Sequence, residues 1–223
     1  MLALVGARVW YRTVGRGVFH CERCGGDRSY LHRSGRRMAH VLGVPVASLG
    51  GTGEHLRCTI CRTCYRVDLL AVPTIAQMLV ALEAGTTAAV LEMLRAGAAG
   101  PAARRRGIEM IRAAGAPDVH DGWLTAALSD PGAAGQSSAY PSTGDLPQDA
   151  EGAAVSLRPV IEALAIQLDI YAREWFLAQV VQVGLADGPL TAAQRSVAGD
   201  VARYLGMTAS RGEDVISLVE EAA

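Results

Sequence analysis

The stretches Cys21-Glu-Arg-Cys24 and Cys58-Thr-Ile-Cys61 decide the fold of the N-terminal part of this chain of 223 residues. Two Cys-x-x-Cys pairs can hold one zinc ion in a tetrahedron of thiolates between two tight turns. Glycines favour such turns because they let backbone amides face the sulfur atoms; they follow the first pair and precede the second at Gly25, Gly26, Gly50, Gly51 and Gly53. The sequence therefore predicts one structural zinc ion held by Cys21, Cys24, Cys58 and Cys61, against the alternative of reduced cysteines without a metal.

A fifth cysteine leaves another ligand set open. Cys64 extends the second pair to Cys58-x-x-Cys61-x-x-Cys64, so Cys61 and Cys64 also have the spacing of a pair. We favour Cys58 and Cys61, because Cys64 precedes Tyr65 at the start of an expected strand, where a small buried thiol is common. With four cysteines available, the neighbouring histidines are expected in turns or at the surface: His20, His32, His40 and His55.

Two kinds of pattern divide the chain and give an α+β fold class. Residues 1–72 have short β-rich runs between glycine turns, with strands expected at 30–32, 41–46, 55–57 and 65–69. From residue 74 the apolar residues follow helical spacing, behind a Thr74-x-x-Gln77 capping box and ahead of Gly85 as a stop. We expect a small β zinc ribbon at 1–72, stabilised largely by its metal, and an all-α domain at 74–223.

The helical part shows further divisions. Helices are expected over 86–96, 101–114, 118–129, 155–185 with a break near Asp169, 192–205 and 211–221. Residues 130–152 are rich in Gly, Ser, Pro, Ala and Asp without an apolar period, which predicts a flexible loop. A shift of 91 positions superposes Gly97 on Gly188, Arg104 on Arg195 and Gly115 on Gly206 without a gap, which indicates a duplicated helical hairpin.

Composition favours a reducing compartment. Five cysteines, an odd number grouped for a metal, do not form a disulfide framework. The first residues lack the apolar region of a signal peptide. The longest apolar run, 69–82, is interrupted by Pro73 and falls short of the ~20 residues that cross a bilayer. We expect a cytoplasmic protein without a membrane span.

Charge is distributed unevenly along the chain. Residues 1–72 carry eleven arginines against four acidic residues, and the remainder carries ten arginines against eighteen. The positive N-terminal part is suited to an anionic partner. We expect a protein partner with an acidic surface, or the chain's own helical domain; the alternative is nucleic acid, contacted by Arg28, Arg33, Arg36 and Arg37. Aromatic residues are too few here to favour sequence-specific reading of single strands.

Both parts of the chain resemble a known family. The stretch Leu185-Ala-Asp-Gly-Pro-Leu-Thr-Ala-Ala-Gln-Arg195, followed by Val201-Ala-Arg-Tyr-Leu-Gly206, resembles the signature of the TerB-like family of tellurite-resistance proteins. The stretch Val18-Phe-His-Cys-Glu-Arg-Cys-Gly-Gly-Asp27, with the distant second cysteine pair, looks like the zinc-ribbon module found ahead of TerB-like domains in actinobacteria. The resemblance implies a helical, non-catalytic sensor or scaffold associated with tellurite resistance and wider stress responses.

The resemblance also implies a candidate for a second metal site. Acidic residues of some TerB-like members bind metal ions, which makes Asp187 a candidate ligand. Gln194 stands where the family pattern usually has glutamate, and the repeat-related position to Asp187 is Ala96, so a hard cation would lose two carboxylates. Asp187 is otherwise a turn residue, and Gln194 completes a Thr191-x-x-Gln194 capping box.

Catalysis has little support in the sequence. Four thiolates around one zinc leave no open position for water or substrate. One histidine, His120, and one aspartate, Asp121, without a nucleophile make no catalytic case. We expect a non-enzymatic, zinc-binding adaptor or scaffold without a small-molecule substrate; a nucleic-acid-binding module is the alternative.

Overall fold

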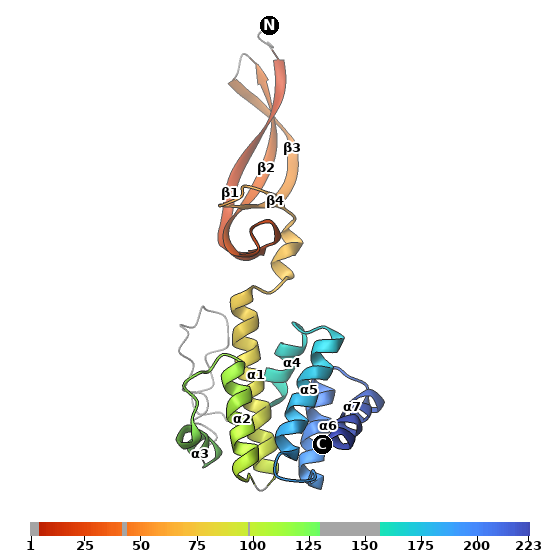
Figure 1. Ribbon diagram of the computed structural model, residues 1–223. Helices are drawn as coiled ribbons and strands as arrows, with labels where there is room; N and C mark the ends of the chain where they lie inside the picture. Colours follow the sequence, from red (N-terminus) through yellow and green to blue (C-terminus); the bar gives the residue numbers. More distant parts are fainter. Residues whose placement is uncertain (1–4, 42–43, 98, 130–156) are drawn as a thin grey trace. The chain divides into compact units, whose positions relative to one another are not determined.

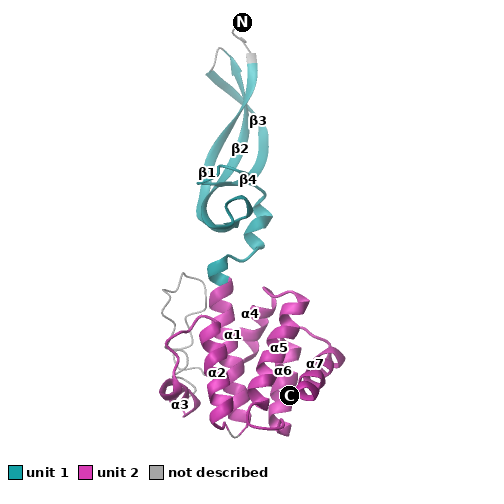
Figure 2. Cartoon of the chain, in the orientation of Figure 1, with its two compact units in different colours: residues 1–77 teal, residues 78–223 magenta. Residues whose placement is uncertain are grey.

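The chain forms two compact units, residues 1–77 and 78–223 (Figure 2). The structure is a computed structural model that describes residues 5–41, 44–97, 99–129 and 157–223. The first unit holds a β-sheet and the second holds helices, so the fold is mixed α+β. The sequence placed the division between residues 72 and 74. The flexible loop expected at 130–152 lies outside the described residues.

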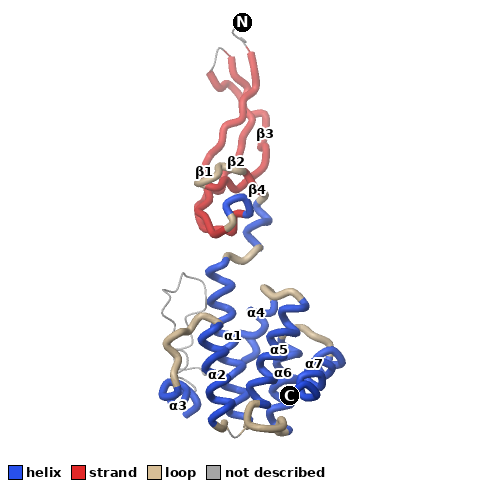
Figure 3. The backbone as a smooth tube through the Cα atoms, viewed as in Figure 1, coloured by secondary structure: helices blue, strands red, loops and turns tan. Residues whose placement is uncertain are grey.

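The first unit is built on a four-stranded antiparallel sheet in the order β1-β2-β3-β4 (Figures 1 and 3). Its strands are β1 Val5–Cys21, β2 Gly26–Val41, β3 Val44–Cys58 and β4 Cys64–Tyr65. Short 3₁₀ helices follow β1 at Glu22–Cys24 and β4 at Val67–Ala71. The first three strands are long, and β4 pairs only through Leu56 with Tyr65 and Arg57 with Cys64.

Several strand predictions were wrong. No strand was predicted before residue 30, yet β1 occupies Val5–Cys21. The run 41–46 was read as one strand, but β2 ends at Val41 and β3 begins at Val44. Residues 67–69 belong to the 3₁₀ helix rather than to a strand. The main cause is that most of β1 and β3 is exposed, so neither strand shows the alternation by which a half-buried strand is recognised.

Two of the glycines before the second cysteine pair lie within a strand of the sheet, not in the turn beside the cysteines as predicted. Gly50 and Gly53 lie inside β3 with φ angles of 119° and 93°, which other residues rarely adopt. They stand beside a shift of register between β2 and β3, where Gly35 pairs with Gly53 and Arg36 with Gly51. Glycine at such places is the usual mark of a β-bulge.

The second unit contains most of α1 and all of the other helices. The helices are α1 Ile75–Ala96, α2 Pro101–Ala113, α3 Asp121–Ser129, α4 Leu157–Ala165, α5 Ile170–Leu185, α6 Ala192–Tyr204 and α7 Ala209–Ala222. Both predicted capping boxes form: Thr74 and Gln77 exchange side-chain to backbone hydrogen bonds, as do Thr191 and Gln194. Asp169, near the predicted break, is the N-cap of α5.

Gly85 does not end a helix as predicted, because α1 continues through it to Ala96. Gly85 is buried, and a Cβ atom there would lie 2.7 Å from Leu164 Cδ2 of α4. The close approach of α4 therefore explains a glycine in the interior of a helix, where its propensity alone predicts a stop.

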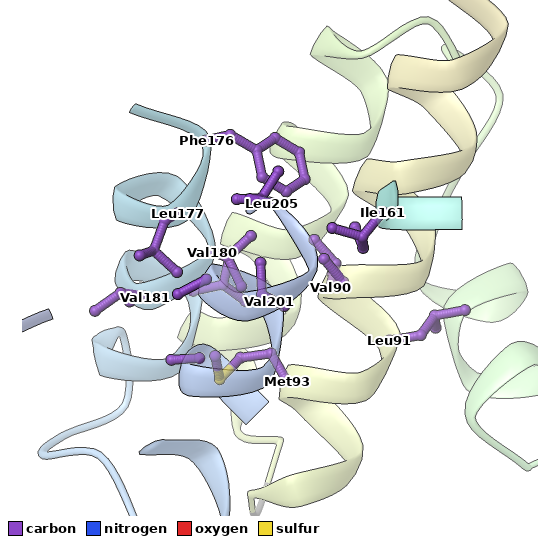
Figure 4. Packing of buried hydrophobic residues seen from close by; sticks show 14 of the residues in the cluster. Val90, Leu91, Met93, Ile161, Phe176, Leu177, Val180, Val181, Val201 and Leu205 are labelled. Atoms are coloured by element: carbon purple, nitrogen blue, oxygen red, sulfur yellow. The ribbon is translucent and has the colours of Figure 1, made fainter. Parts of the chain in front are cut away.

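All seven described helices contribute buried residues to the core of the helical unit, and Figure 4 shows the part that lies among α1, α4, α5 and α6. Val90 and Met93 of α1 pack with Phe176 and Val180 of α5, and all four side chains are almost completely buried. Ile161 adds the contribution of α4. A core of this size is typical of a helical domain that folds without a metal.

One stretch of the described residues is long and apolar enough to cross a membrane by length and composition. It runs over Val67–Ala96, with a mean hydropathy of 1.6 in its 18-residue window, of which 6% is buried. In the structure Pro73 separates the 3₁₀ helix from α1. The C-terminal half of α1 supplies Val90, Met93 and Leu94 to the core, so spanning a membrane would require these side chains to leave it.

The helical unit also agrees with the predicted duplication. Adding 91 to both bounds of α2 gives the bounds of α6. Both helices end in the same motif: Gly115 and Gly206 have φ angles of 128° and 74°, and the amides of Ala116 and Met207 donate to the carbonyls of Ile111 and Ala202. The same shift of 91 relates every residue of the two motifs.

Candidate metal centre

Four cysteines of the first unit meet at one end of the sheet. Cys21 ends β1, Cys24 ends the following 3₁₀ helix, Cys58 ends β3, and Cys61 lies in the turn before β4. All four Sγ atoms lie within 4.8 Å of one another; Cys21 and Cys61 are 3.7 Å apart, and Cys24 and Cys58 are 4.0 Å apart. A tetrahedron with Zn–S bonds of about 2.3 Å has edges of roughly 3.8 Å. The sulfur atoms are therefore close enough to hold a metal ion.

The two cysteine pairs sit in turns of matching geometry. The amide of Gly25 donates to the carbonyl of Cys21 over 2.9 Å, and the amide of Arg62 donates to that of Cys58 over 3.1 Å. Gly25 and Arg62 both adopt the left-handed backbone conformation, with φ angles of 65° and 60°. Arg62 is the only non-glycine residue with a positive φ in the described part of the chain, a conformation that costs a side chain about 1–2 kcal/mol. The second turn thus adopts the shape of the first, with Arg62 at the position that Gly25 occupies in the first.

A small apolar cluster supports the four sulfur atoms. Phe19, Cys21 and Cys58 are almost completely buried, and Tyr30 and Tyr65 pack against them. The ring of Phe19 meets both tyrosine rings edge to face, at centroid distances of 5.6 and 5.4 Å. This cluster is much smaller than the core of the helical unit, so hydrophobic burial contributes little to the stability of the sheet.

The surroundings of the thiols raise the pKa of one cysteine and lower the pKa of two others. Burial raises the pKa of Cys24 to about 11. Hydrogen bonds from the hydroxyl and amide of Thr63 lower the pKa of Cys61 to about 6. Burial also opposes ionisation of Cys21, but hydrogen bonds from the Tyr65 hydroxyl, 3.2 Å away, and from the backbone lower its pKa overall. The cluster thus favours thiolates at some of its members, and a bound dication would remove the remaining protons.

Asp27 ties the start of β2 to the first turn of α1 within the first unit. Its two carboxylate oxygens accept hydrogen bonds from the amides of Ile75 and Ala76, each over 3.1 Å. Burial opposes ionisation of Asp27, but these amides and His20, 3.5 Å away, lower the pKa of the carboxyl overall. Asp27 thus adds a second, non-local cap to a helix that the sequence showed only with its Thr74 capping box.

The other candidate ligands lie elsewhere. Cys64 is exposed on β4, not buried as predicted, and does not belong to the group of four. Nor do the four histidines: His20 faces Asp27, His32 lies 2.8 Å from Glu54, His40 accepts from Trp10, and His55 meets the ring of Tyr11. The structure brings together the four cysteines of the favoured ligand set, and neither Cys64 nor any of these histidines joins them.

The four arginines proposed to contact an anionic partner are spread along β2. Arg28 and Arg37 are nine positions apart, which is roughly 30 Å in an extended strand. Side chains alternate along a strand, so Arg28 and Arg36 belong to one face of β2, and Arg33 and Arg37 belong to the other. These side chains therefore do not form a single patch.

Asp187 caps a helix in the structure. Its Oδ1 and Oδ2 accept hydrogen bonds from the amides of Ala102 and Ala103, each over 3.0 Å, at the first turn of α2. A Cβ atom at Gly100 would lie 2.6 Å from the Asp187 carboxylate, so glycine there makes room for the cap. In the described part of the chain Asp187 belongs to no group of three or more potential metal ligands.

Replacing Asp187 by alanine is expected to destabilise the helical unit by about 1–2 kcal/mol, because two amides of α2 lose their acceptor. Asp187→Asn keeps one acceptor oxygen and is expected to lose less. Urea unfolding followed by circular dichroism measures both. If calcium or magnesium stabilised the parent and failed to stabilise Asp187→Ala, Asp187 would be a metal ligand and the capping role would be insufficient.

An open groove with a volume of about 770 Å³ lies in the described part of the helical unit. It lies over α2 and the start of α3, and Arg104, Arg105, Ile108 and His120 are among its lining residues. Asp121 at its edge is paired with Arg104 at 2.7 Å. The lining contains Glu109, His120 and Asp121 but no serine, cysteine, threonine or lysine.

Comparisons of the chain with protein-family models, curated proteins and solved structures found no match. The fold and the site therefore define the class directly. It is an α+β chain in which an antiparallel sheet carries a four-cysteine cluster suited to a metal ion, followed by an α-helical unit.

Proposed function

We propose that this protein is a zinc-stabilised, non-enzymatic adaptor of the cytoplasm. The observation that carries the proposal is the group of four cysteine sulfur atoms within 4.8 Å of one another. Zinc is the metal that four thiolates in a tetrahedron suit best, and such sites are structural because all four positions are filled by protein. The zinc would hold the end of β1 to the end of β3, where the apolar cluster is small.

The adaptor role is supported by the charges of the two parts. Residues 1–72 have a net charge of +7 and residues 73–223 have −8, counting Arg, Asp and Glu. Because the two parts carry opposite charges, they suit different partners. The positive first part suits an acidic protein surface.

The stress-response part of the proposal rests on the resemblance of residues 185–206 to TerB-like proteins. In the structure this stretch holds the α5–α6 turn, the capping box of Thr191 and the motif that ends α6. Its Asp187 caps α2, and its Gln194 is buried in the capping box. We therefore propose that the helical unit acts as a scaffold without a second metal.

Cobalt substitution tests whether the centre is structural. Co²⁺ at a closed four-thiolate site is expected to give the visible spectrum of tetrahedral thiolate coordination, unchanged by an excess of azide, because no ligand position is open. The four-cysteine centre would be catalytic in type if azide altered the spectrum. Turnover of a small-molecule substrate that is abolished by one substitution in the helical unit would contradict the non-enzymatic role.

A further inference from the structure

The end of the sheet opposite the four cysteines exposes a group of apolar side chains. β2 ends at Val41 and β3 begins at Val44, and these two residues pair with each other. Val41, Val44, Val46 and Leu49 are 40%, 61%, 58% and 57% exposed, respectively. We call these four residues the sheet tip. These exposed side chains leave apolar surface at this end of the sheet.

Basic and aromatic residues lie level with Leu49 and behind the three valines of the sheet tip. Trp10 is 55% exposed, and its Nε1 donates to His40 Nε2 over 3.0 Å. Arg8 pairs with Met38, and Arg36 and Arg37 pair with Trp10 and Val9. All three arginines are exposed. Residues 1–21 and 28–53 contain seven arginines and no acidic residue, so nothing neutralises this part of the sheet from within its own sequence.

The order of these residues matches the layers of a membrane surface. Apolar side chains at the extreme end would enter the acyl region, tryptophan favours the interface, and arginines reach lipid phosphates. An anionic leaflet attracts basic residues by about 1 kcal/mol each near the surface. We propose that the sheet tip inserts into the surface of membranes that contain anionic lipids, with Arg8, Arg36 and Arg37 on the phosphates.

Nucleic acid fits the same residues less well. A duplex would place its phosphates against the arginines. Val41, Val44 and Val46 lie closer to the end of the sheet than Arg36 and Arg37, so they would remain exposed to water. Arg36 and Arg37 also belong to opposite faces of β2, which suits a surface that surrounds the end of the sheet more than a rod that lies along one face. An anionic lipid surface uses both the apolar and the basic residues.

Sedimentation with vesicles tests the proposal on the full chain. The parent is expected to bind vesicles of phosphatidylcholine with phosphatidylglycerol, to bind pure phosphatidylcholine at least tenfold more weakly, and to be released by high salt. Val44→Asp/Val46→Asp and Arg8→Gln/Arg36→Gln/Arg37→Gln should each weaken binding at least tenfold. The matched control, Ile166→Asp/Leu218→Asp, puts the same charges on exposed apolar positions of the helical unit and should bind like the parent. Metal content and circular dichroism show that each variant is folded.

Fluorescence locates the contact. In a Trp123→Phe/Trp175→Phe background Trp10 is the only tryptophan, and its emission should shift to the blue with anionic vesicles and be quenched by brominated lipids. Folded parent protein that does not bind anionic vesicles would overturn the proposal. The proposal would also be overturned if the parent bound duplex DNA and vesicles equally and only the arginine variant weakened this binding, since the ligand would then be any polyanion. Binding that survives in the tip variant but is lost in Leu79→Asp/Val80→Asp would move the contact to α1 and overturn it as well.

Discussion

Replacing Cys21 and Cys58 together by serine is expected to abolish metal binding and to unfold the sheet of the first unit. Each Cys-x-x-Cys pair then has a single thiol, and Cys21 and Cys58 are the buried members of the cluster. Zinc binding contributes about 10–16 kcal/mol in zinc-finger peptides, comparable with or larger than the whole stability of a small domain. The amides of β2 should lose their protection from hydrogen exchange, while those of α5 keep it.

The matched control for this variant is Cys64→Ser. Cys64 is a cysteine of the same unit, exposed and outside the group of four, so its variant should keep the metal and the protection of β2. Equal loss of protection in both variants would mean that Cys64 takes part in the centre. A double variant whose sheet stays protected would show that the apolar cluster around Phe19 is sufficient without a metal.

Replacing Phe176 by alanine is expected to destabilise the helical unit by about 3–5 kcal/mol and to leave the metal content unchanged. The Phe176 side chain is almost completely buried in the core of the helical unit, and its removal costs both burial and a cavity. The midpoint of urea unfolding, followed by circular dichroism of the helices, should fall with little change in the slope.

The matched control lies on the same helix. Tyr171 is 78% exposed on α5, so Tyr171→Ala removes a ring of similar size from the surface and should change stability by less than about 0.5 kcal/mol. Loss of metal from Phe176→Ala in proportion to its loss of helix would contradict the view that the two units are stabilised separately, one by its metal and the other by its core.

Local signals in the sequence predicted much of the helical unit. The capping boxes at Thr74 and Thr191 are formed by neighbours in the chain, so their patterns are visible without a structure, and the break predicted near Asp169 falls at the N-cap of α5. The cysteine spacing likewise identified four residues that the structure brings together. Glycines at Gly115 and Gly206 end α2 and α6 as their positions indicate.

Non-local contacts explain what the sequence could not predict. Asp187 caps a helix 85 residues away, and Asp27 caps one 48 residues away, so neither partner is visible from its neighbours. From the sequence, Gly85 predicts the end of a helix, whereas in the structure its missing side chain makes room for Leu164. β1 has exposed residues on both faces, so its pairing with β2, rather than an apolar pattern, makes it a strand.

The central claim is that four cysteines hold one zinc ion, and metal content per chain tests it most directly. Elemental mass spectrometry on protein purified without added zinc, beside the Cys21→Ser/Cys58→Ser variant, should give one zinc per parent chain and none in the variant. Folded parent protein without zinc, or a variant that retains it, would contradict the account.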